Sequence, residues 1–417
     1  MDAESVAVAE ADEYTWVQKT FWSLRHREYR LLWFGSLFSS AALWIQQTTI
    51  NWLTYQVTGS AFMLGAVNGI RSLPLLFLAP FGGLAADRLD KKKLMFVTQM
   101  FLMAVTAAFA TVVLLDYAAV WNIILFSVLT GIGWALNMPV RQAIVPKLVP
   151  REDLQNAIAL NAAGFNITRV VGPSIGGLLI ATVGMWGNFY IQTVMYLGVA
   201  AMVWQLQIVD DRDQRANKKG VGGSLLEGAR YVWKNKGLRL QMTVALLPVL
   251  LALPYITLMP VIARDELDVK ARGFGFLMSA PGIGAVTGTL LVASMGNIQR
   301  RGLLIFLCLI GLGNSLIAVA LSNHYSVTFS LLILAGAFQM VYMSQNQTML
   351  QLKTPDEFRG RVMGIFMLNQ GLMPLGSIAA GVLAEYQGAP FAIAAMGIAL
   401  VVLSVIALAT LKTMREA

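Results

Sequence analysis

The sequence predicts an all-α membrane protein in which twelve transmembrane helices form two pseudo-symmetric bundles of six. Composition and pattern both support this prediction. Apolar residues make up 57% of the chain and charged residues only 13%, which is not the balance of a soluble domain. Apolar runs of roughly 20 residues, the length that crosses a bilayer, recur along the chain with short polar breaks between them. Almost the whole chain is therefore expected to lie in the membrane.

The apolar runs define the predicted spans in chain order. Short polar breaks separate the runs. Residues 1–20 are acidic and polar and lack the apolar core of a cleavable leader, so the first span is expected to serve as the insertion signal. The predicted spans are 31–55, 61–86, 94–115, 120–146, 155–182, 188–208, 239–262, 273–295, 302–321, 325–351, 361–385 and 390–411.

A polar linker divides the spans into two halves. Asp210–Gly223 is rich in charged residues and glycine, the composition of a flexible hinge, and Leu225–Lys236 can form an amphipathic helix. The predicted domains are a cytoplasmic N-terminal arm (1–30), an N-terminal six-helix bundle (31–208), a cytoplasmic linker with the amphipathic helix (209–238), a C-terminal six-helix bundle (239–411) and a cytoplasmic tail (412–417).

The two halves repeat weakly. When they are aligned, three polar positions of span four fall opposite three positions of span ten. The aligned pairs are Trp134 with Gln339, Asn137 with Tyr342, and Arg141 with Asn346. Two matching halves around a site near the bilayer midplane are typical of transporters.

The basic residues predict the orientation. Most of the 31 Lys and Arg residues lie in the segments on one side, whereas the loops on the other side hold only Arg264, Lys270 and Arg272. By the positive-inside rule, both termini are expected in the cytoplasm of a multi-pass protein of the bacterial inner (plasma) membrane. The net charge of +9 is then a topology signal, so we expect contact with membrane lipid and no nucleic-acid partner.

Reactive side chains are too sparse for catalysis. Cys308 is the only cysteine and lies in an apolar run, and the two histidines, His26 and His324, lie near predicted span ends. These residues do not form the clusters that hold metal ions. The sequence also places no catalytic base beside a nucleophilic side chain. We therefore expect no metal, no cofactor and no enzymatic activity.

Polar residues inside the predicted spans are the candidates for a substrate cavity, because lipid penalises them on an outer face. Trp44, Gln47 and Asn51 form one stripe at helical spacing, which could also be hydrogen-bonding glue between helices. Arg169 and Arg71 lie near mid-depth, where a charge costs on the order of 3 kcal/mol. Each arginine could form hydrogen bonds to a neighbouring helix or could attract an anionic or electron-rich substrate. The first role is favoured for Arg71. The predicted cavity residues are Trp44, Gln47, Asn51, Asn137, Asn166, Arg169, Gln339, Tyr342 and Asn346.

Several stretches resemble a known family, the major facilitator superfamily. Gly82–Lys93 (GGLAADRLDKKK) is similar to its signature loop between spans two and three, and Val170–Gly177 (VVGPSIGG) is similar to the signature of its exporters. Three further stretches resemble the branch that contains enterobactin exporters, macrolide efflux pumps and transmembrane secretion effectors. They are WLTYQVTGSAFMLG, MPVRQAIVPKLVPREDLQNAIALN and LKTPDEFRGRVMG. The resemblance implies alternating access and export of a small molecule.

The signature loop is the predicted gate. Gly83, Asp87 and Arg88 lie in or next to it, and Asp87 could pair with Arg141 at the inner end of span four. The alternative is a solvated loop whose charges only set topology. In span five, Gly172, Pro173, Gly176 and Gly177 form a small-residue seam that permits close packing and gives the helix a place to bend.

The predicted function is export of a small amphipathic compound, drug-like or siderophore, by a monomer. Proton coupling is implied by the resemblance alone, since Asp116 and Glu385 fall at outer span ends and Asp87 at an inner one. Import of a polar metabolite and a transport-inactive membrane scaffold or sensor are the alternatives. The exporter-type seam argues against import, and the tight loops without an attached soluble domain argue against a scaffold.

Overall fold

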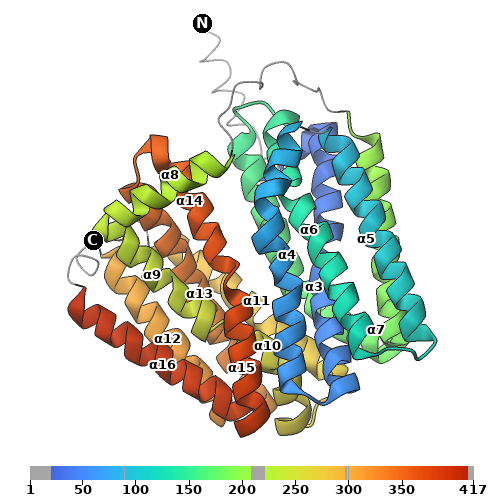
Figure 1. The fold of residues 1–417 in the computed structure, drawn as a ribbon, viewed down its shortest axis with the longest axis vertical. Helices are drawn as coiled ribbons and strands as arrows, with labels where there is room; N and C mark the ends of the chain where they lie inside the picture. The colour runs from blue at the N-terminus through green and yellow to red at the C-terminus, as the bar shows by residue number, and fades with distance from the viewer. Residues whose placement is uncertain (1–19, 89, 208–220, 296–297, 299, 412–417) are drawn as a thin grey trace, which may run out of the picture.

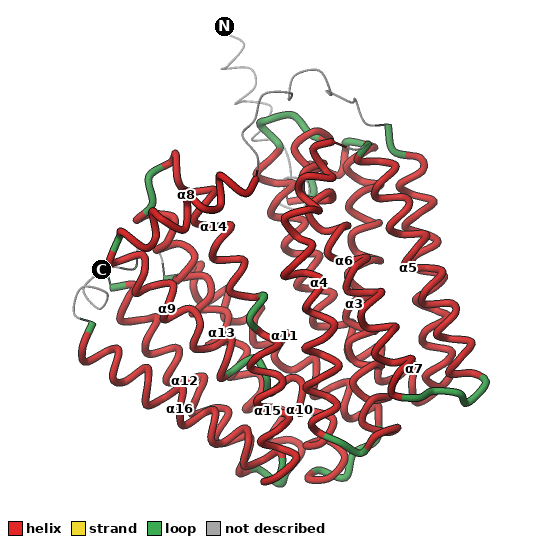
Figure 2. The backbone as a smooth tube through the Cα atoms, viewed as in Figure 1, coloured by secondary structure: helices red, strands yellow, loops and turns green. Residues whose placement is uncertain are grey.

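The computed structural model describes residues 20–88, 90–207, 221–295, 298 and 300–411. Within these ranges the chain is helical and holds no strand, as predicted (Figure 2). Eight helical segments of the described chain are long and apolar enough to cross a membrane. The number of crossings, twelve, stays a prediction.

One group of helices comes from the first half of the chain and lies beside a second group from the other half (Figure 1). The first group contains η1 (Trp22–Arg25), α3 (Arg27–Thr58), α4 (Ala61–Arg88), α5 (Lys91–Leu114), α6 (Val120–Leu148) and α7 (Leu154–Gln205). The second group contains α8 (Val221–Lys234), α9 (Lys236–Leu251), α10 (Tyr255–Val261), η3 (Ile262–Glu266), α11 (Ala271–Ser294), α12 (Arg301–Leu321), α13 (Tyr325–Lys353), α14 (Asp356–Gln370), α15 (Met373–Gln387) and α16 (Ala389–Thr410).

Local chemistry explains where several of these helices begin and break. The Asp90 carboxylate accepts a hydrogen bond from the Lys93 amide at 3.0 Å and so caps α5. The predicted span 155–182 and most of the predicted span 188–208 fall within α7, which ends at Gln205 and is interrupted at Gly184 with φ 75° and ψ 176°. Glycine adopts this backbone conformation without the clash that a side chain would introduce.

The two groups touch most closely where both helices carry small residues. A Cβ atom added at Gly177 of α7 would lie only 2.7 Å from the Gly275 Cα of α11. Likewise, a Cβ atom at Gly381 of α15 would lie 2.8 Å from the carbonyl oxygen of Ala61 in α4. The backbones of the two groups therefore approach as closely as glycine permits.

These contacts gather toward one end of the molecule. We call the end that holds η1 the η1 end, and the end that holds the turn at Gly59 the Gly59 end (Figure 1). At the Gly59 end Tyr55 donates a hydrogen bond to the Asp265 carboxylate of the other group. Nearby, the rings of Trp52 and Phe274 stack with centroids 5.3 Å apart. The two groups are thus joined at the Gly59 end.

At the η1 end, the segment before α3 is fastened to the start of α7. Arg25 donates to the Asp153 carboxylate at 2.9 Å, and His26 Nε2 lies 2.6 Å from the same Asp153 oxygen. Ser23 Oγ donates to the Asp153 carbonyl oxygen at 3.1 Å. Burial by itself would raise the pKa of Asp153. The hydrogen bonds from His26 and Arg25, together with their positive charge, lower the pKa by more than burial raises it, so the pKa lies below its usual value.

Candidate functional site

A cavity of about 390 Å³ lies between the two groups of helices, in the part of the molecule nearer the η1 end. Its walls come from α3, α6 and α7 of the first group and from α13 of the second. The lining residues are Trp33, Ser36, Leu37, Ser40, Met138, Arg141, Gln142, Val145, Asn161, Ala162, Gly164, Phe165, Asn166, Arg169, Met340 and Met343. This volume is within the range of small-molecule sites.

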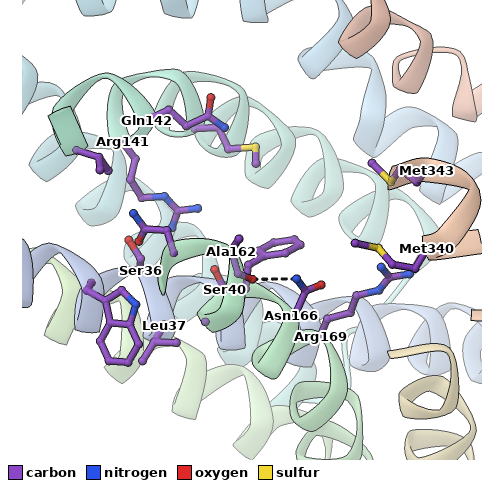
Figure 3. A pocket seen from close by; sticks show the side chains of 16 residues that line it. Ser36, Leu37, Ser40, Arg141, Gln142, Ala162, Asn166, Arg169, Met340 and Met343 are labelled. Carbon is purple, nitrogen blue, oxygen red and sulfur yellow. Dashed lines mark hydrogen bonds between the residues drawn. The ribbon is translucent and has the colours of Figure 1, made fainter. Parts of the chain in front are cut away.

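Two arginines supply the charge of the cavity. Arg141 from α6 and Arg169 from α7 both line the cavity, and the Arg169 side chain extends toward Met340 of α13 (Figure 3). Arg141 Nη1 is buried and has no hydrogen-bond partner among the described residues. Each guanidinium lies over an indole ring of its surroundings, Arg141 at 5.9 Å from the Trp134 centroid and Arg169 at 5.8 Å from the Trp44 centroid. Such contacts stabilise a cation without neutralising it.

The remaining wall of the cavity is mostly apolar and aromatic. Phe165 packs against Trp44 with ring centroids 5.8 Å apart, and Met340 and Met343 approach from α13. Asn166, a predicted cavity residue, donates to its own helix at the Ala162 carbonyl, 2.9 Å away (Figure 3). The cavity therefore offers two cations, a few neutral polar groups and a broad apolar surface, which suits binding rather than catalysis.

A second, smaller cavity adjoins the first. It measures about 30 Å³ and is lined by Gln339 and Tyr342, both predicted cavity residues, together with Asn369. Met343 lines both cavities. Gln339 Oε1 is buried without a partner among the described residues. Of the predicted set, Asn166 and Arg169 thus line the larger cavity, and Gln339 and Tyr342 line the smaller one.

Gln47 and Asn51 lie instead in a buried network between α3 and α4. Gln47 accepts a hydrogen bond from the Arg71 guanidinium and donates to Asn68 at 2.7 Å and to Asn51 at 3.2 Å. Asn68 in turn donates to Asn51 at 2.9 Å. Arg71 therefore ties two neighbouring helices together, the role that the sequence favours for it.

Two further predicted cavity residues also bond to neighbouring helices. Asn137 of α6 donates to Thr98 of α5 at 2.8 Å. Gln241 of α9 donates to Asn346 of α13, at the backbone carbonyl oxygen 3.0 Å away and at the side-chain Oδ1 3.3 Å away. Both asparagines are buried, so in this conformation their side chains serve helix packing.

Comparison with known proteins assigns the chain to a family. The model of the family described as transmembrane secretion effector matches residues 18–417. The chain belongs to this family. It is therefore a transporter of the major facilitator type, as the motifs of the sequence suggest.

Curated relatives are similar to this chain along most of their length. The Staphyloferrin A transporter of Staphylococcus aureus is 27% identical over 370 residues, which cover 87% of this chain and 91% of that protein. The multidrug efflux pump Tap of Mycolicibacterium fortuitum is 27% identical over 386 residues, 90% of this chain and 94% of that pump. Macrolide efflux protein A of Streptococcus pyogenes is 26% identical over 378 residues, 88% and 91% of the two chains.

Solved transporter structures share the fold of this chain. The nucleoside transporter NupG superposes with a TM-score of 0.73 at 15% identity, covering 92% of this chain and 99% of that chain. A POT family transporter in complex with a thioalcohol conjugated peptide gives a TM-score of 0.74 at 11% identity, covering 93% and 96%. At these identities the likeness shows the fold alone.

The predicted gate lies only partly within the described residues. Gly83, Asp87 and Arg88 belong to α4, but their side chains lie outside the described residues. Arg141, assigned to the gate from the sequence, lines the larger cavity. The latch between Asp87 and Arg141 stays a prediction.

The predicted small-residue seam of α7 packs against helices of both groups. A Cβ atom on Gly172 would come 2.6 Å from the Trp44 Cβ of α3, and one on Gly176 would come 3.4 Å from the Ile45 Cα. Gly177 faces α11, as described above. Pro173 lies within α7, and the residue of α7 with non-helical φ and ψ is Gly184. Bending at the seam stays a prediction.

Sequence reasoning missed several lining residues of the cavity. Trp33, Ser36 and Ser40 of α3 lie one to three turns before the predicted stripe of that helix, and Met138 of α6 is three residues before Arg141. The spacing of Ser36 and Ser40, one turn apart, was the available signal. The methionines carried no such signal, because apolar residues are equally common on lipid-facing surfaces.

Proposed function

We propose that the chain is a secondary active transporter that exports a small amphipathic molecule by alternating access. The observation that supports this most strongly is the position of the larger cavity. It lies between the two groups of helices and takes residues from both, while the groups are joined at the Gly59 end. A site shared in this way would change its exposure if the groups rocked against each other. Relatives named as efflux pumps and as a siderophore transporter support export.

The proposal includes an orientation and a division into domains. With both termini in the cytoplasm, the η1 end is the cytoplasmic end, and the cavity lies toward the cytoplasm where an exporter collects its substrate. The proposed bundles are 31–208 and 239–411, with the arm 1–30, the linker 209–238 and the tail 412–417 at the cytoplasmic surface. The protein acts as a monomer in the bacterial inner membrane.

We further propose that protons drive export. The resemblance to proton-driven exporters supports this part of the proposal. Among the described residues, no carboxylate lines either cavity. The titrating group would then lie elsewhere in the chain.

Inside-out membrane vesicles test the export function. Vesicles from cells that express the protein are energised with a respiratory substrate and offered a macrolide and, in a separate assay, a siderophore. We expect one of them to accumulate above the level of vector-only vesicles, and a protonophore to abolish the difference. Equal accumulation in both kinds of vesicle for every compound would favour the scaffold alternative. Uptake by right-side-out vesicles alone would favour import.

A further inference from the structure

Three arginines that lie within the helix groups differ in the hydrogen-bond partners that the described residues offer them. Arg71 donates to the Gln47 side-chain oxygen and so has a partner within the helix pair α3 and α4. Arg141 and Arg169 form no ion pair among the described residues and are instead directed into the larger cavity. A buried or half-buried charge costs several kcal/mol unless water or an opposite charge compensates it. Water in the cavity can solvate these two charges, and an anionic group of a ligand can take its place.

We propose that the larger cavity binds an anionic amphipathic substrate whose acidic groups, carboxylates or chemically similar anions, are held by Arg141 and Arg169. This assigns a substrate class to the proposed export function and rests on that function for its physiological meaning. Guanidinium groups bind carboxylates through two parallel hydrogen bonds, and Arg141 Nη1 is free among the described residues to donate one. A cationic substrate would instead meet two like charges in a confined space.

The walls of the cavity define the rest of the substrate. Trp33, Phe165, Met340 and Met343 supply aromatic and thioether surface around the two cations. Methionine side chains adapt to ligands of different outline, and aromatic rings stack on planar groups. The matching ligand carries one or more acidic groups on a planar or otherwise apolar body. An inorganic anion would satisfy the arginines but leave this apolar surface unused.

Two dyes of the same shape and opposite charge test the inference. Carboxyfluorescein is a multiply charged anion, and a rhodamine ester with the same xanthene ring system is a cation. Binding of each to the purified full-length protein in detergent is measured by fluorescence anisotropy. We expect the wild-type protein to bind carboxyfluorescein at least about tenfold more tightly than the rhodamine ester, since each lost charge-assisted contact costs 1.5 kcal/mol or more. Added salt should weaken only the binding of the anion.

Variants then assign the effect to the two arginines. Arg141→Gln and Arg169→Gln should each weaken carboxyfluorescein binding about tenfold and leave rhodamine binding unchanged or tighter. The matched control is Arg230→Gln, which removes an exposed positive charge from α8, away from both cavities, and should leave the binding of both dyes unchanged. Equal affinity of the wild-type protein for both dyes, absence of carboxyfluorescein binding, or unchanged anion binding in both arginine variants would each overturn the inference. The comparison of dyes and salt needs only the wild-type protein, so it decides even if a variant does not fold.

Energised vesicles separate this inference from the export function itself. Accumulation of the rhodamine ester without carboxyfluorescein would support export and overturn the anionic substrate class. Arginine-dependent binding of carboxyfluorescein together with no energised accumulation of any compound would uphold the anion site and overturn export.

Discussion

Glu385 of α15 caps the first turn of α4, a helix of the other group. Its Oε2 atom accepts hydrogen bonds from Ser60 Oγ at 2.9 Å and from the Phe62 amide at 3.1 Å. A carboxylate at a helix N-terminus meets unpaired amides and the positive end of the helix dipole. The interaction therefore spans the boundary between the two groups and stabilises their contact at the Gly59 end.

Removing this cap should loosen the Gly59 end. Glu385→Ala should weaken the contact between α15 and α4 by about 1 to 2 kcal/mol. The population in which the two groups touch at the Gly59 end then falls about fivefold or more relative to the population in which they are separated there. The distance between spin labels at the exposed positions 57 and 386, one on each group, measures the change in a Cys308→Ser background. Glu385→Gln keeps an oxygen that can accept both hydrogen bonds and should have a smaller effect. Identical distance distributions for wild type and Glu385→Ala would refute the cap.

A side chain at Gly177 should force the two groups apart. The Gly275 backbone of α11 leaves no room for it, and overpacking of this kind costs about 1 to 3 kcal/mol. We expect Gly177→Leu to widen the distance between the same labels. Gly198→Leu on the same helix is the matched control, because a Cβ atom there meets nothing within 4 Å. If both variants behave like the wild type, the glycine contact does not hold the groups together.

Gln47→Leu should destabilise the protein by leaving the Arg71 guanidinium without its acceptor. A lost hydrogen bond to a buried charge costs about 2 kcal/mol or more. We expect a clear fall in the Tm of the purified protein, measured by tryptophan fluorescence in detergent. Gln142→Leu removes a similar amide that lines the cavity and should leave the Tm nearly unchanged. Equal Tm values for Gln47→Leu and wild type would show that Arg71 finds another partner.

The cluster of Arg25, His26 and Asp153 should make stability depend on pH. The pKa of Asp153 is lower in the folded protein than the value of about 3.9 expected in the unfolded chain. Its contribution is therefore fully present above about pH 4 and is lost as the pH falls through the lowered pKa. We expect Asp153→Asn to reduce the Tm at pH 7 and to differ less from wild type near pH 3. A Tm difference that stays constant over this range would contradict the assignment.

Asp87→Asn tests the predicted gate. If the Asp87 carboxylate forms the latch with Arg141, the variant should reach the membrane in normal amounts but lose energised accumulation in inside-out vesicles. Asp90→Asn, three residues further along the same loop, is the control, since Asp90 caps α5 through an oxygen that asparagine retains. Normal transport by Asp87→Asn would leave the loop only its role in topology.

The helices were predictable because lipid leaves a long apolar segment few alternatives. A backbone without water must satisfy its hydrogen bonds internally, so composition alone predicts helix over most of the chain. Arg169 and Asn166 were also predictable from the sequence, because a charged or polar side chain within a membrane span must face protein or water. The structure places both on the cavity wall.

The partners of each polar stripe were not predictable. Gln47 and Asn51 share a helix face, as the spacing indicates, but the spacing does not reveal that Asn68 and Arg71 face them from α4. The same holds for Asn137, which meets Thr98. Arg141 was assigned to the gate because of its place near a span end, whereas the structure places it in the wall of the larger cavity. Contacts between helices decide these outcomes, and the spacing of residues within one helix does not reveal them.

The three methionines of the larger cavity have a consequence for selectivity. Met138 of α6 and Met340 and Met343 of α13 form a deformable surface, while Arg141 and Arg169 are charges fixed to helices. A ligand with a different outline can be accommodated by rotation of the thioether side chains, but a ligand with a different charge cannot. The site would thus tolerate variation in shape and discriminate by charge, so chemically diverse acids should compete with one another for a single place in the molecule.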